Sequence, residues 1–504
     1  MSVETPDTPE TPPHDRPGSG AARAEGTPAP TPSPRAGGWQ ALRPLVLRLH
    51  FCAGLLIAPF LLVAAVTGLL YAASFQIEKA VYADELTVDV PKGGPHGDPA
   101  RLPLSRQVEA ALDAHPDGEL TAVRPSSEPE AATRVLLDDP SVADPDNSLA
   151  VFVDPYTARV QGALESYGSS GALPVRAWID HLHRDLHLGE PGRLYSEFAA
   201  SWLWVVALGG VALWLGRARG QRKLRGTTGA RRTLSLHGTV GLWAALGLLV
   251  LSATGLSWSA YAGANIEALR TSVGSATPTV SADTDTGEGT GTGHEGHGSG
   301  GDHSGHGTHE GHGDAHAGHP AEPEDVGLDR VLTVAREGQG LSGPIEITPS
   351  SGPGSAYVVA QTDKQWPHHL DQIAVDPSDG KVVDRLDFKD YPLLAKLTRW
   401  GIDGHQGLLF GLANQVLLMA LAGALITLIV LGYRMWWHHC VPPQRGAWRR
   451  VPLPTLLPLV AVAAVVGWFL PLFGIGLVAF LTVDAVLGVR ARRRARTART
   501  ARTD

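Results

Sequence analysis

Four uninterrupted apolar blocks in this 504-residue chain are too long for the core helices of a water-soluble protein. Each block is long enough to cross the roughly 30 Å hydrocarbon core of a bilayer as one helix. A fifth block is too long for one crossing and has a Leu-Pro step near its middle, which predicts a hairpin of two helices. The predicted spans of this polytopic α-helical membrane protein, about six in number, lie in residues 44–75, 196–216, 234–262, 405–437 and, for the hairpin, 451–489.

Charged residues divide into basic and acidic segments between these blocks. Residues 217–233 carry seven Lys or Arg and no acid, and residues 490–504 carry seven Arg against one Asp. The positive-inside rule makes both segments cytoplasmic, and with them the N- and C-termini. Residues 76–195 hold 20 acidic against 10 basic residues, and residues 263–404 hold 22 against 9, so we predict that both lie outside the cell membrane. Arg outnumbers Lys 35 to 7 in a chain rich in Ala and Gly, which is typical of a GC-rich bacterial genome.

The remaining segments narrow the choice of partners. Residues 1–43 contain nine prolines and are rich in Thr and Gly, which predicts a disordered cytoplasmic tail. The chain has no glycine-rich nucleotide loop, nucleophile elbow or His-Glu-x-x-His motif, and its predicted cytoplasmic loops are too short for a flavin or nicotinamide domain. A redox function would need a separate electron donor, either a cytoplasmic reductase or a quinol. The basic segments are typical of topology signals beside the lipid bilayer, not of a nucleic-acid site.

An internal repeat relates the two halves of the chain. Leu-His at 49–50 and Thr-Gly-Leu at 67–69 recur at 236–237 and 254–256, at one offset of 187 residues. The first and third predicted spans are therefore copies, and a four-helix membrane core is duplicated from one pair of helices.

The two external segments are copies as well. A Pro-Ser-Ser triplet at 125–127 recurs at 349–351, and Val-Asp-Pro at 153–155 recurs at 375–377. Each copy has a helical apolar pattern, then alternating strands and an Asp-Pro turn whose Asp is expected to cap that turn. The two predicted small α+β domains span residues 76–195 and 326–404.

These motifs resemble those of a known family. The ending Val-Asp-Pro-x-x-[Gly/Ala]-[Lys/Arg]-Val is similar to PepSY domains, and paired spans with an early Leu-His and a late Thr-Gly-Leu resemble the PepSY-associated transmembrane family. That family includes iron-regulated membrane proteins and ferric-siderophore reductases. The resemblance covers residues 40–437 and implies that membrane histidines bind haem and that electrons move outward to ferric iron. The His-rich insertion, the Pro-rich tail and the two extra spans depart from the family's pattern.

Four histidines recur in repeat-related pairs. His50 and His237 lie near the inner ends of the first and third spans, where an imidazole within lipid needs a partner. Two imidazoles that face each other across a four-helix bundle can be both axial ligands of a haem iron; a hydrogen bond between helices is the alternative. His187 and His405 precede the second and fourth spans and form the predicted outer pair, with His183 as a secondary candidate. We expect two haem b groups, one in each leaflet.

Eight further histidines lie in a glycine-rich tract, residues 293–319, within a predicted linker over 263–325. The glycines prevent a fixed geometry, so the tract is either a loose site for Zn, Cu or Fe or a spacer with incidental metal affinity. The histidines of the tract are His294, His297, His303, His306, His309, His312, His316 and His319.

Three functions are open at this point. The first is a haem-binding transmembrane electron carrier that reduces an extracytoplasmic ferric species, such as a ferric siderophore, in iron acquisition. The second is a metal-handling or metal-sensing membrane protein that uses the His-rich tract. The third, by analogy with the PepSY fold alone, is a regulator of an external peptidase. No residue is assigned a catalytic role.

Overall fold

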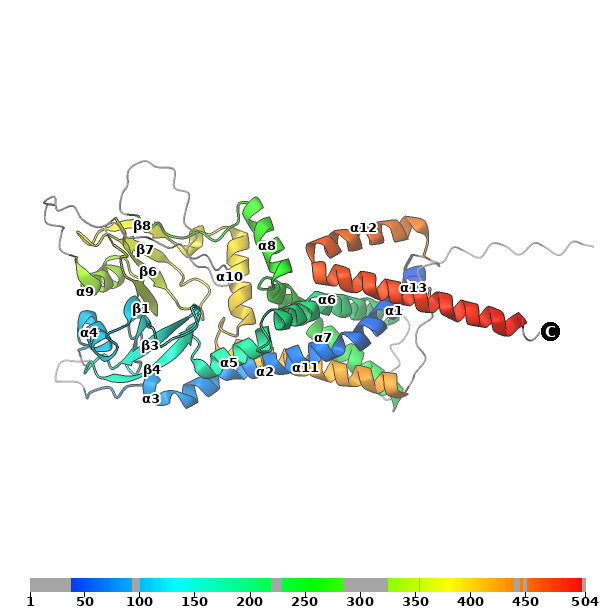
Figure 1. Cartoon of the computed structure of the whole chain (residues 1–504), viewed down its shortest axis with the longest axis horizontal. Coiled ribbons are helices and arrows are strands. Elements are labelled where there is room, and N and C mark those ends of the chain that lie inside the picture. Colours follow the sequence, from blue (N-terminus) through cyan, green and yellow to red (C-terminus); the bar gives the residue numbers. More distant parts are fainter. Residues whose placement is uncertain are drawn as a thin grey trace, which may run out of the picture.

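A helical bundle and a β-sheet lie at opposite ends of this elongated molecule, which is described here as a computed structural model (Figure 1). The structure describes residues 38–92, 100–218, 229–283, 325–352, 354–438, 445–446 and 451–500. The sequence predicts a disordered tail over residues 1–43; its first 37 residues lie outside the described ranges, whereas residues 38–43 are helical and begin the first helix. The whole histidine-rich tract also lies outside the described residues.

The bundle is built from two repeat-related pairs of helices. The first pair is a kinked rod, α1 (Gly38–Leu56) followed by α2 (Ala58–Val81), together with α6 (Glu190–Ala218). The second pair is α7 (Ala230–Leu256) and α11 (Leu412–His438). Contacts run from α2 to α6, from α6 to α7, from α7 to α11 and back to α2. The four units therefore form a closed ring around an apolar interior.

Proline divides the predicted first span, residues 44–75, between α1 and α2. Pro59 has no N–H, and its ring conflicts with the carbonyl four residues earlier, that of Leu55. This carbonyl instead accepts a hydrogen bond from the Tyr433 hydroxyl of α11 at 3.0 Å. The kink is thus stabilised by a neighbouring helix of the other repeat.

Five of the described helices are long and apolar enough to cross a bilayer, so the chain is a multi-pass helical membrane protein. They are α2, α6, α7, α11 and the first part of α13 (Pro471–Thr500). Helix α12 (Leu453–Phe469) is apolar but shorter. It is separated from α13 by Leu470 alone, and this break lies where the sequence predicts the turn of the hairpin.

The part of the chain beyond the bundle forms one antiparallel sheet of eight strands, in the order β4-β3-β2-β1-β5-β6-β7-β8. The first repeat contributes β1 to β4 and the second β5 to β8, so the two predicted α+β units share a single sheet. They meet where Val123 of β1 pairs with Ile347 of β5. The strands are β1 (Glu119–Arg124), β2 (Thr133–Asp138), β3 (Asn147–Val153), β4 (Val160–Tyr167), β5 (Ile345–Thr348), β6 (Tyr357–Gln361), β7 (Gln372–Val375) and β8 (Val382–Leu386).

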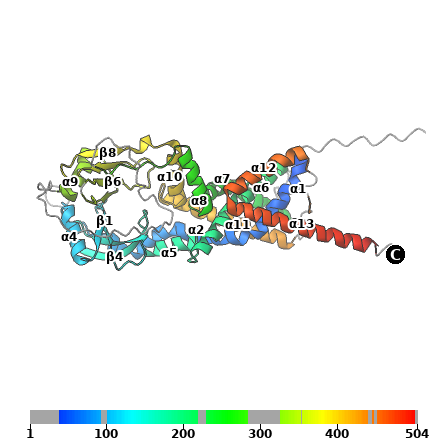
Figure 2. The same ribbon diagram turned by 45° about the horizontal axis from the view of Figure 1, so that its top comes forward.

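Helices cover both faces of the sheet. Helix α4 (Leu104–Ala114), and α9 (Gly327–Thr333) with the π-helical turn η1 (Val334–Gly338), lie on the face that points away from the bundle (Figure 2). Their apolar side chains join those of both sets of strands in one buried cluster. The opposite face packs against the end of α2, the short α3 (Ala83–Leu86) and the start of α5 in the first repeat, and against α10 in the second.

Two short helices return the chain from the sheet to the bundle. Helix α5 (Pro174–Arg184) packs along α2, and α10 (Leu393–His405), which follows the 3₁₀ turn η2 (Phe388–Asp390), packs along α7. Helix α8 (Tyr261–Ser272) continues outward from α7. Because α5 and α10 come from different repeats, each repeat returns one short helix to the bundle.

The Asp-Pro turns at the end of each repeat confirm the expected capping role of their aspartates. Asp154 Oδ1 accepts from the Tyr156 N–H at 2.8 Å, and Asp376 Oδ1 accepts from the Ser378 N–H at 2.7 Å. The Gly/Ala position of the pattern has a left-handed backbone in both copies, with φ of 56° at Ala158 and 70° at Gly380. This backbone conformation favours glycine, which the second copy has, whereas Ala158 of the first copy adopts it with a Cβ present.

A carboxylate of the second repeat caps a helix of the first, which gives a test of how the repeats are joined. Helix α4 begins after Pro103, which has no capping side chain, and the Asp329 carboxylate of α9 accepts hydrogen bonds from the N–H groups of Leu104 and Ser105. We predict that Asp329→Ala lowers the free energy of unfolding of the eight-stranded sheet by about 1 kcal/mol. Denaturant unfolding of the detergent-solubilised protein measures it. Asp117→Ala, at an exposed turn residue after α4, is the control; equal losses in both variants would contradict the assignment.

Candidate functional site

Two imidazoles face each other in the part of the bundle far from the sheet. His50 of α1 and His237 of α7 have ring centroids 6.3 Å apart, with their planes at 71°. His50 Nδ1–H donates to the carbonyl of Val206 on α6 at 2.9 Å, which leaves Nε2 as the free nitrogen of the neutral ring. His237 Nδ1 is buried, and although the Leu428 backbone comes near, no hydrogen bond of normal geometry reaches this atom from the described residues.

Glycines allow the neighbouring helices to approach His50 and His237, which are called the inner pair from here on. A Cβ on Gly210 of α6 would lie 3.1 Å from His50 Cε1, and one on Gly209 would lie 3.4 Å from His50 Cβ. On the other side, a Cβ on Gly432 of α11 would lie 3.9 Å from His237 Cε1. Of these three positions only 210 is tight, so a larger residue there would require the His50 ring to shift.

A second pair, His183 with His405, lies where α5 and α10 meet the bundle and is called the outer pair from here on. His183 of α5 and His405 of α10 have ring centroids 6.4 Å apart, with their planes at 41°. Thr67 Oγ1 lies 2.9 Å from His183 Nδ1, and Thr254 Oγ1 lies 2.8 Å from His405 Nδ1. The same arrangement is therefore made once by each repeat.

The threonine hydroxyls determine which imidazole nitrogen carries the proton. Thr67 donates its hydroxyl proton to the Val63 carbonyl at 2.9 Å, and Thr254 donates to the Val250 carbonyl at 2.8 Å. Each Oγ1 can then only accept from the histidine, so Nδ1 is protonated and Nε2 keeps its lone pair. An oxygen acceptor behind a histidine is the usual way in which proteins orient a metal-binding imidazole.

The Gly of each Thr-Gly-Leu motif provides room for the ring. A Cβ on Gly68 would lie 3.1 Å from His183 Cε1, and one on Gly255 would lie 3.4 Å from His405 Cε1. The motif therefore orients one histidine through its Thr and accommodates the ring through its Gly. The motif is visible in the sequence because Thr-Gly-Leu recurs at the same offset as His50 and His237. Its role toward His183 and His405 is visible only in the structure.

The structure places His183, not His187, opposite His405. His187 is the predicted counterpart because a His-x-Gly sequence, at 187–189 and 405–407, precedes both the second and the fourth predicted span. However, α10 continues through His405, whereas α5 ends at Arg184 and the chain then turns, with φ of 55° at His187. His187 is exposed there, and its Nε2–H donates to the Trp178 carbonyl at 3.0 Å.

Surrounding protein keeps the outer pair neutral. Burial lowers the pKa of His183 to about 4, and burial together with His183 lowers the pKa of His405 to about 3. Both residues retain some exposed surface, but their rings are enclosed on the threonine side and by Tyr71 and Trp258, whose ring centroids lie 6.5 Å and 5.7 Å away. A neutral imidazole with a free Nε2 is the form that binds metal.

The spacing within each pair would allow its two imidazoles to hold one metal ion between them. A metal bonded to a nitrogen of each ring at about 2 Å holds the centroids roughly 6 Å apart. Each pair offers two nitrogens, and the described residues include no cluster of three or more His, Cys, Asp or Glu that could hold an ion alone. Two imidazoles match the protein's share of a haem, because the macrocycle fills the other positions. On α7, His237 marks the level of the inner pair and Thr254 the level of the outer pair. They are 17 residues apart, or about 25 Å along the helix.

Comparison with protein families identifies the group to which the chain belongs. The family model of the PepSY-associated TM region matches residues 47–439. The chain is a member of this family. The match includes both histidine pairs and the whole eight-stranded sheet, while the α12–α13 hairpin lies beyond it. A comparison with curated proteins finds no match.

Removing a threonine hydroxyl tests the outer pair of this PepSY-associated chain. Thr254→Val leaves the buried His405 Nδ1–H without an acceptor, so we predict a loss of about 1–3 kcal/mol in the free energy of unfolding. Thr254→Ser should recover most of it. Thr427→Val is the matched control, since that hydroxyl donates to Gly423 on its own exposed helix face. Equal stability of Thr254→Val and wild type would show that the hydrogen bond has no structural role.

The pH dependence of stability follows from the two lowered pKa values. The unfolded chain protonates these imidazoles near pH 6.5, but the folded protein does so only near pH 4 or below. The free energy of unfolding is therefore highest above pH 6.5 and falls as the pH drops toward 4. At pH 5 each histidine has lowered it by about 1–2 kcal/mol. Unfolding midpoints at pH 7.5 and pH 5 measure it. The double variant His183→Gln/His405→Gln should flatten the dependence, whereas His181→Gln/His187→Gln should not.

Proposed function

We propose that this chain is a haem-binding transmembrane electron carrier that reduces an extracytoplasmic ferric species, specifically a ferric siderophore complex, in iron acquisition. The observation that carries the proposal is the presence of two apposed imidazole pairs at two levels of one bundle. Membership of the PepSY-associated family supports it. Haem, when bound, supplies an iron that gains and loses single electrons.

The inner pair would receive electrons. His50 lies on α1 and His237 on α7. The Val206 carbonyl determines which ring nitrogen of His50 carries the proton. Their end of the bundle is the one that the basic loop and tail assign to the cytoplasm. A quinol or a cytoplasmic reductase is the proposed donor, since the chain has no nucleotide-binding motif of its own.

The outer pair would pass electrons to the ferric substrate. His183 and His405 lie at the ends of the two helices that descend from the sheet, so they are the histidine pair nearer to the external domain. Their threonine partners hold both Nε2 atoms unprotonated without placing a charge beside them. A neutral, oriented donor set of this kind stabilises an axial position without competing for protons.

Two arginines lie on the sheet face that points toward the bundle, and a cationic side chain there favours an anionic ferric complex as substrate. Arg124 and Arg134 line a cavity of about 210 Å³ on this face. Arg124 is paired with Glu346 at 2.6 Å, while Arg134 contacts the Gly171 carbonyl at 3.4 Å and the Phe152 ring. Burial and the neighbouring Arg124 lower the pKa of Arg134 to about 10, so it remains charged at neutral pH. These cations stand out in an external part that is strongly acidic overall.

Haem content and ferric reduction test the proposal. Purified protein should show a Soret band equivalent to two haems, and His405→Ala or His183→Ala should reduce it to about half, because one axial ligand of the outer pair is lost. His50→Ala or His237→Ala should do the same for the inner pair. His187→Ala is the matched control and should keep the full band, since its ring faces Trp178.

The reaction is followed by mixing anaerobically reduced protein with a soluble ferric chelate. Wild type should reoxidise, and His405→Ala should do so about tenfold more slowly or worse. A protein that shows no Soret band even after haem supplementation would overturn the proposal. So would full haem content in all four alanine variants.

A further inference from the structure

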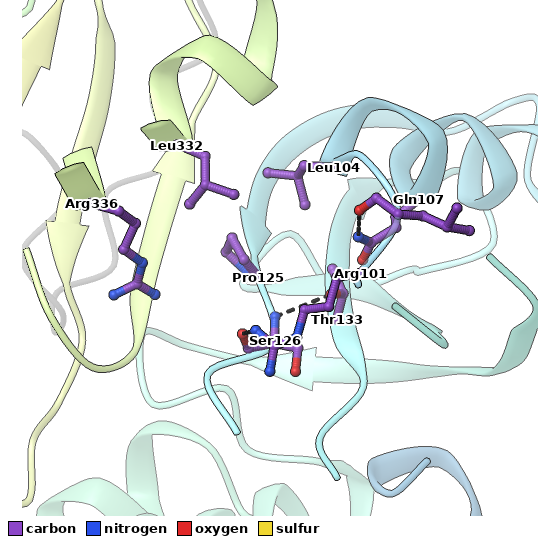
Figure 3. A pocket seen from close by; sticks show the side chains of 9 residues that line it. Arg101, Leu104, Gln107, Pro125, Ser126, Thr133, Leu332 and Arg336 are labelled. Atoms are coloured by element: carbon purple, nitrogen blue, oxygen red, sulfur yellow. Dashed lines mark hydrogen bonds between the residues drawn. The ribbon is translucent and has the colours of Figure 1, made fainter. Parts of the chain in front are cut away.

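A cavity of about 200 Å³ lies on the other side of the sheet, away from the histidine pairs, where the two repeats meet (Figure 3). Leu332 and Arg336 of the second repeat border it from one side, and Arg101, Leu104 and Gln107 of the first repeat border it from the other. Pro125 lies between the two groups. The cavity has no part in the proposed electron transfer.

Two guanidinium groups in this cavity have no carboxylate partner among the described residues. Arg101 donates to the carbonyls of Ser126 and Glu128 at 2.7 Å and 2.9 Å. Arg336 donates through Nη1 to the carbonyls of Leu341 and Gly343 at 2.8 Å and 2.6 Å, which leaves its Nε and Nη2 free. The carbonyls fix both side chains but do not neutralise them. Burial and the nearby Arg101 lower the pKa of Arg336 below its usual value.

An unpartnered acceptor lies in the same cavity. Gln107 is only 4% exposed, and its Nε2 donates to the Leu102 carbonyl at 2.8 Å. Its Oε1 is buried and has no hydrogen-bond partner among the described residues. Leaving such an atom unsatisfied costs about 1–3 kcal/mol, which a ligand with a hydrogen-bond donor would recover.

The combination of groups specifies a ligand class. Guanidinium groups bind carboxylates through paired hydrogen bonds, and the free Oε1 of Gln107 requires an N–H or O–H donor. Leu104, Leu332 and Pro125 offer an apolar surface to a short carbon chain. At about 30 Å³ for each water-sized group, the cavity has room for roughly six or seven non-hydrogen atoms.

We propose that this cavity binds a small carboxylate that carries a hydroxyl or amino donor on the neighbouring carbon, that is, a 2-hydroxy or 2-amino acid. Such a ligand would contact Arg336 from one repeat and Arg101 and Gln107 from the other. The strand pairing between the repeats is limited to Val123 and Ile347, so a bridging ligand stabilises the weakest part of the sheet.

Calorimetric titration of the full-length protein in detergent with L-lactate, L-alanine and propionate tests the proposal. Lactate or alanine should bind, and the one that binds more tightly identifies the donor. Propionate has the same length but no donor, so it should bind about tenfold more weakly. This ligand comparison uses the wild-type protein alone and does not depend on the folding of any variant. Absence of binding by all three acids at millimolar concentration would overturn the proposal, as would equal affinity for lactate and propionate.

Variants then assign the contacts. Arg336→Gln and Arg101→Gln should each weaken binding of the preferred acid about tenfold or more. Gln107→Leu should remove the preference over propionate while leaving propionate binding unchanged. Arg106→Gln is the matched control, because this exposed residue of α4 pairs with Glu109 on the helix surface. Binding that is unchanged in Arg336→Gln would show that the ligand lies elsewhere.

Discussion

A hydrogen bond from an imidazole to a threonine hydroxyl, made once in each repeat, connects the two ends of this protein. Thr67 and Thr254 are on helices of the bundle, whereas His183 and His405 are on helices that come from the sheet. Inside a bilayer-spanning bundle a polar side chain must find its partner within the protein. The bond therefore fixes where α5 and α10 meet the bundle, the tautomer of both histidines and the distance between their rings. The position of the sheet relative to the bundle follows from the same contact.

The sequence was sufficient for those features that depend on local pattern. Long apolar blocks predicted the membrane helices, a fixed offset indicated an internal repeat, and a Leu-Pro step indicated the break before Pro471. The outer pair was only partly predictable. Which of two histidines four residues apart faces His405 depends on where α5 ends, and helical periodicity does not give that endpoint. The pairing of β1 with β5 was likewise out of reach, because strands far apart in sequence recognise each other through packing that no single segment encodes.

The joining of the repeats has consequences on both faces of the sheet. On the face that points away from the bundle, Asp329 of one repeat caps α4 of the other. The space left between α4 and η1 is lined by arginines whose partners are backbone carbonyls. On the inner face, Arg124 pairs with Glu346 across the same junction. Polar groups that would be surface side chains in a separate domain thus become interface groups.

Each histidine pair takes one member from each repeat: His50 with His237, and His183 with His405. A single copy could offer only half of either pair, so both require the duplicated chain or a dimer of an undivided half. The two pairs nevertheless differ in support. The outer rings are held by side-chain hydroxyls, while the inner pair relies on one backbone carbonyl and on glycines that admit the ring. Because a hydroxyl can be removed without moving the backbone and a helix carbonyl cannot, the outer pair is the one whose orientation single substitutions can tune.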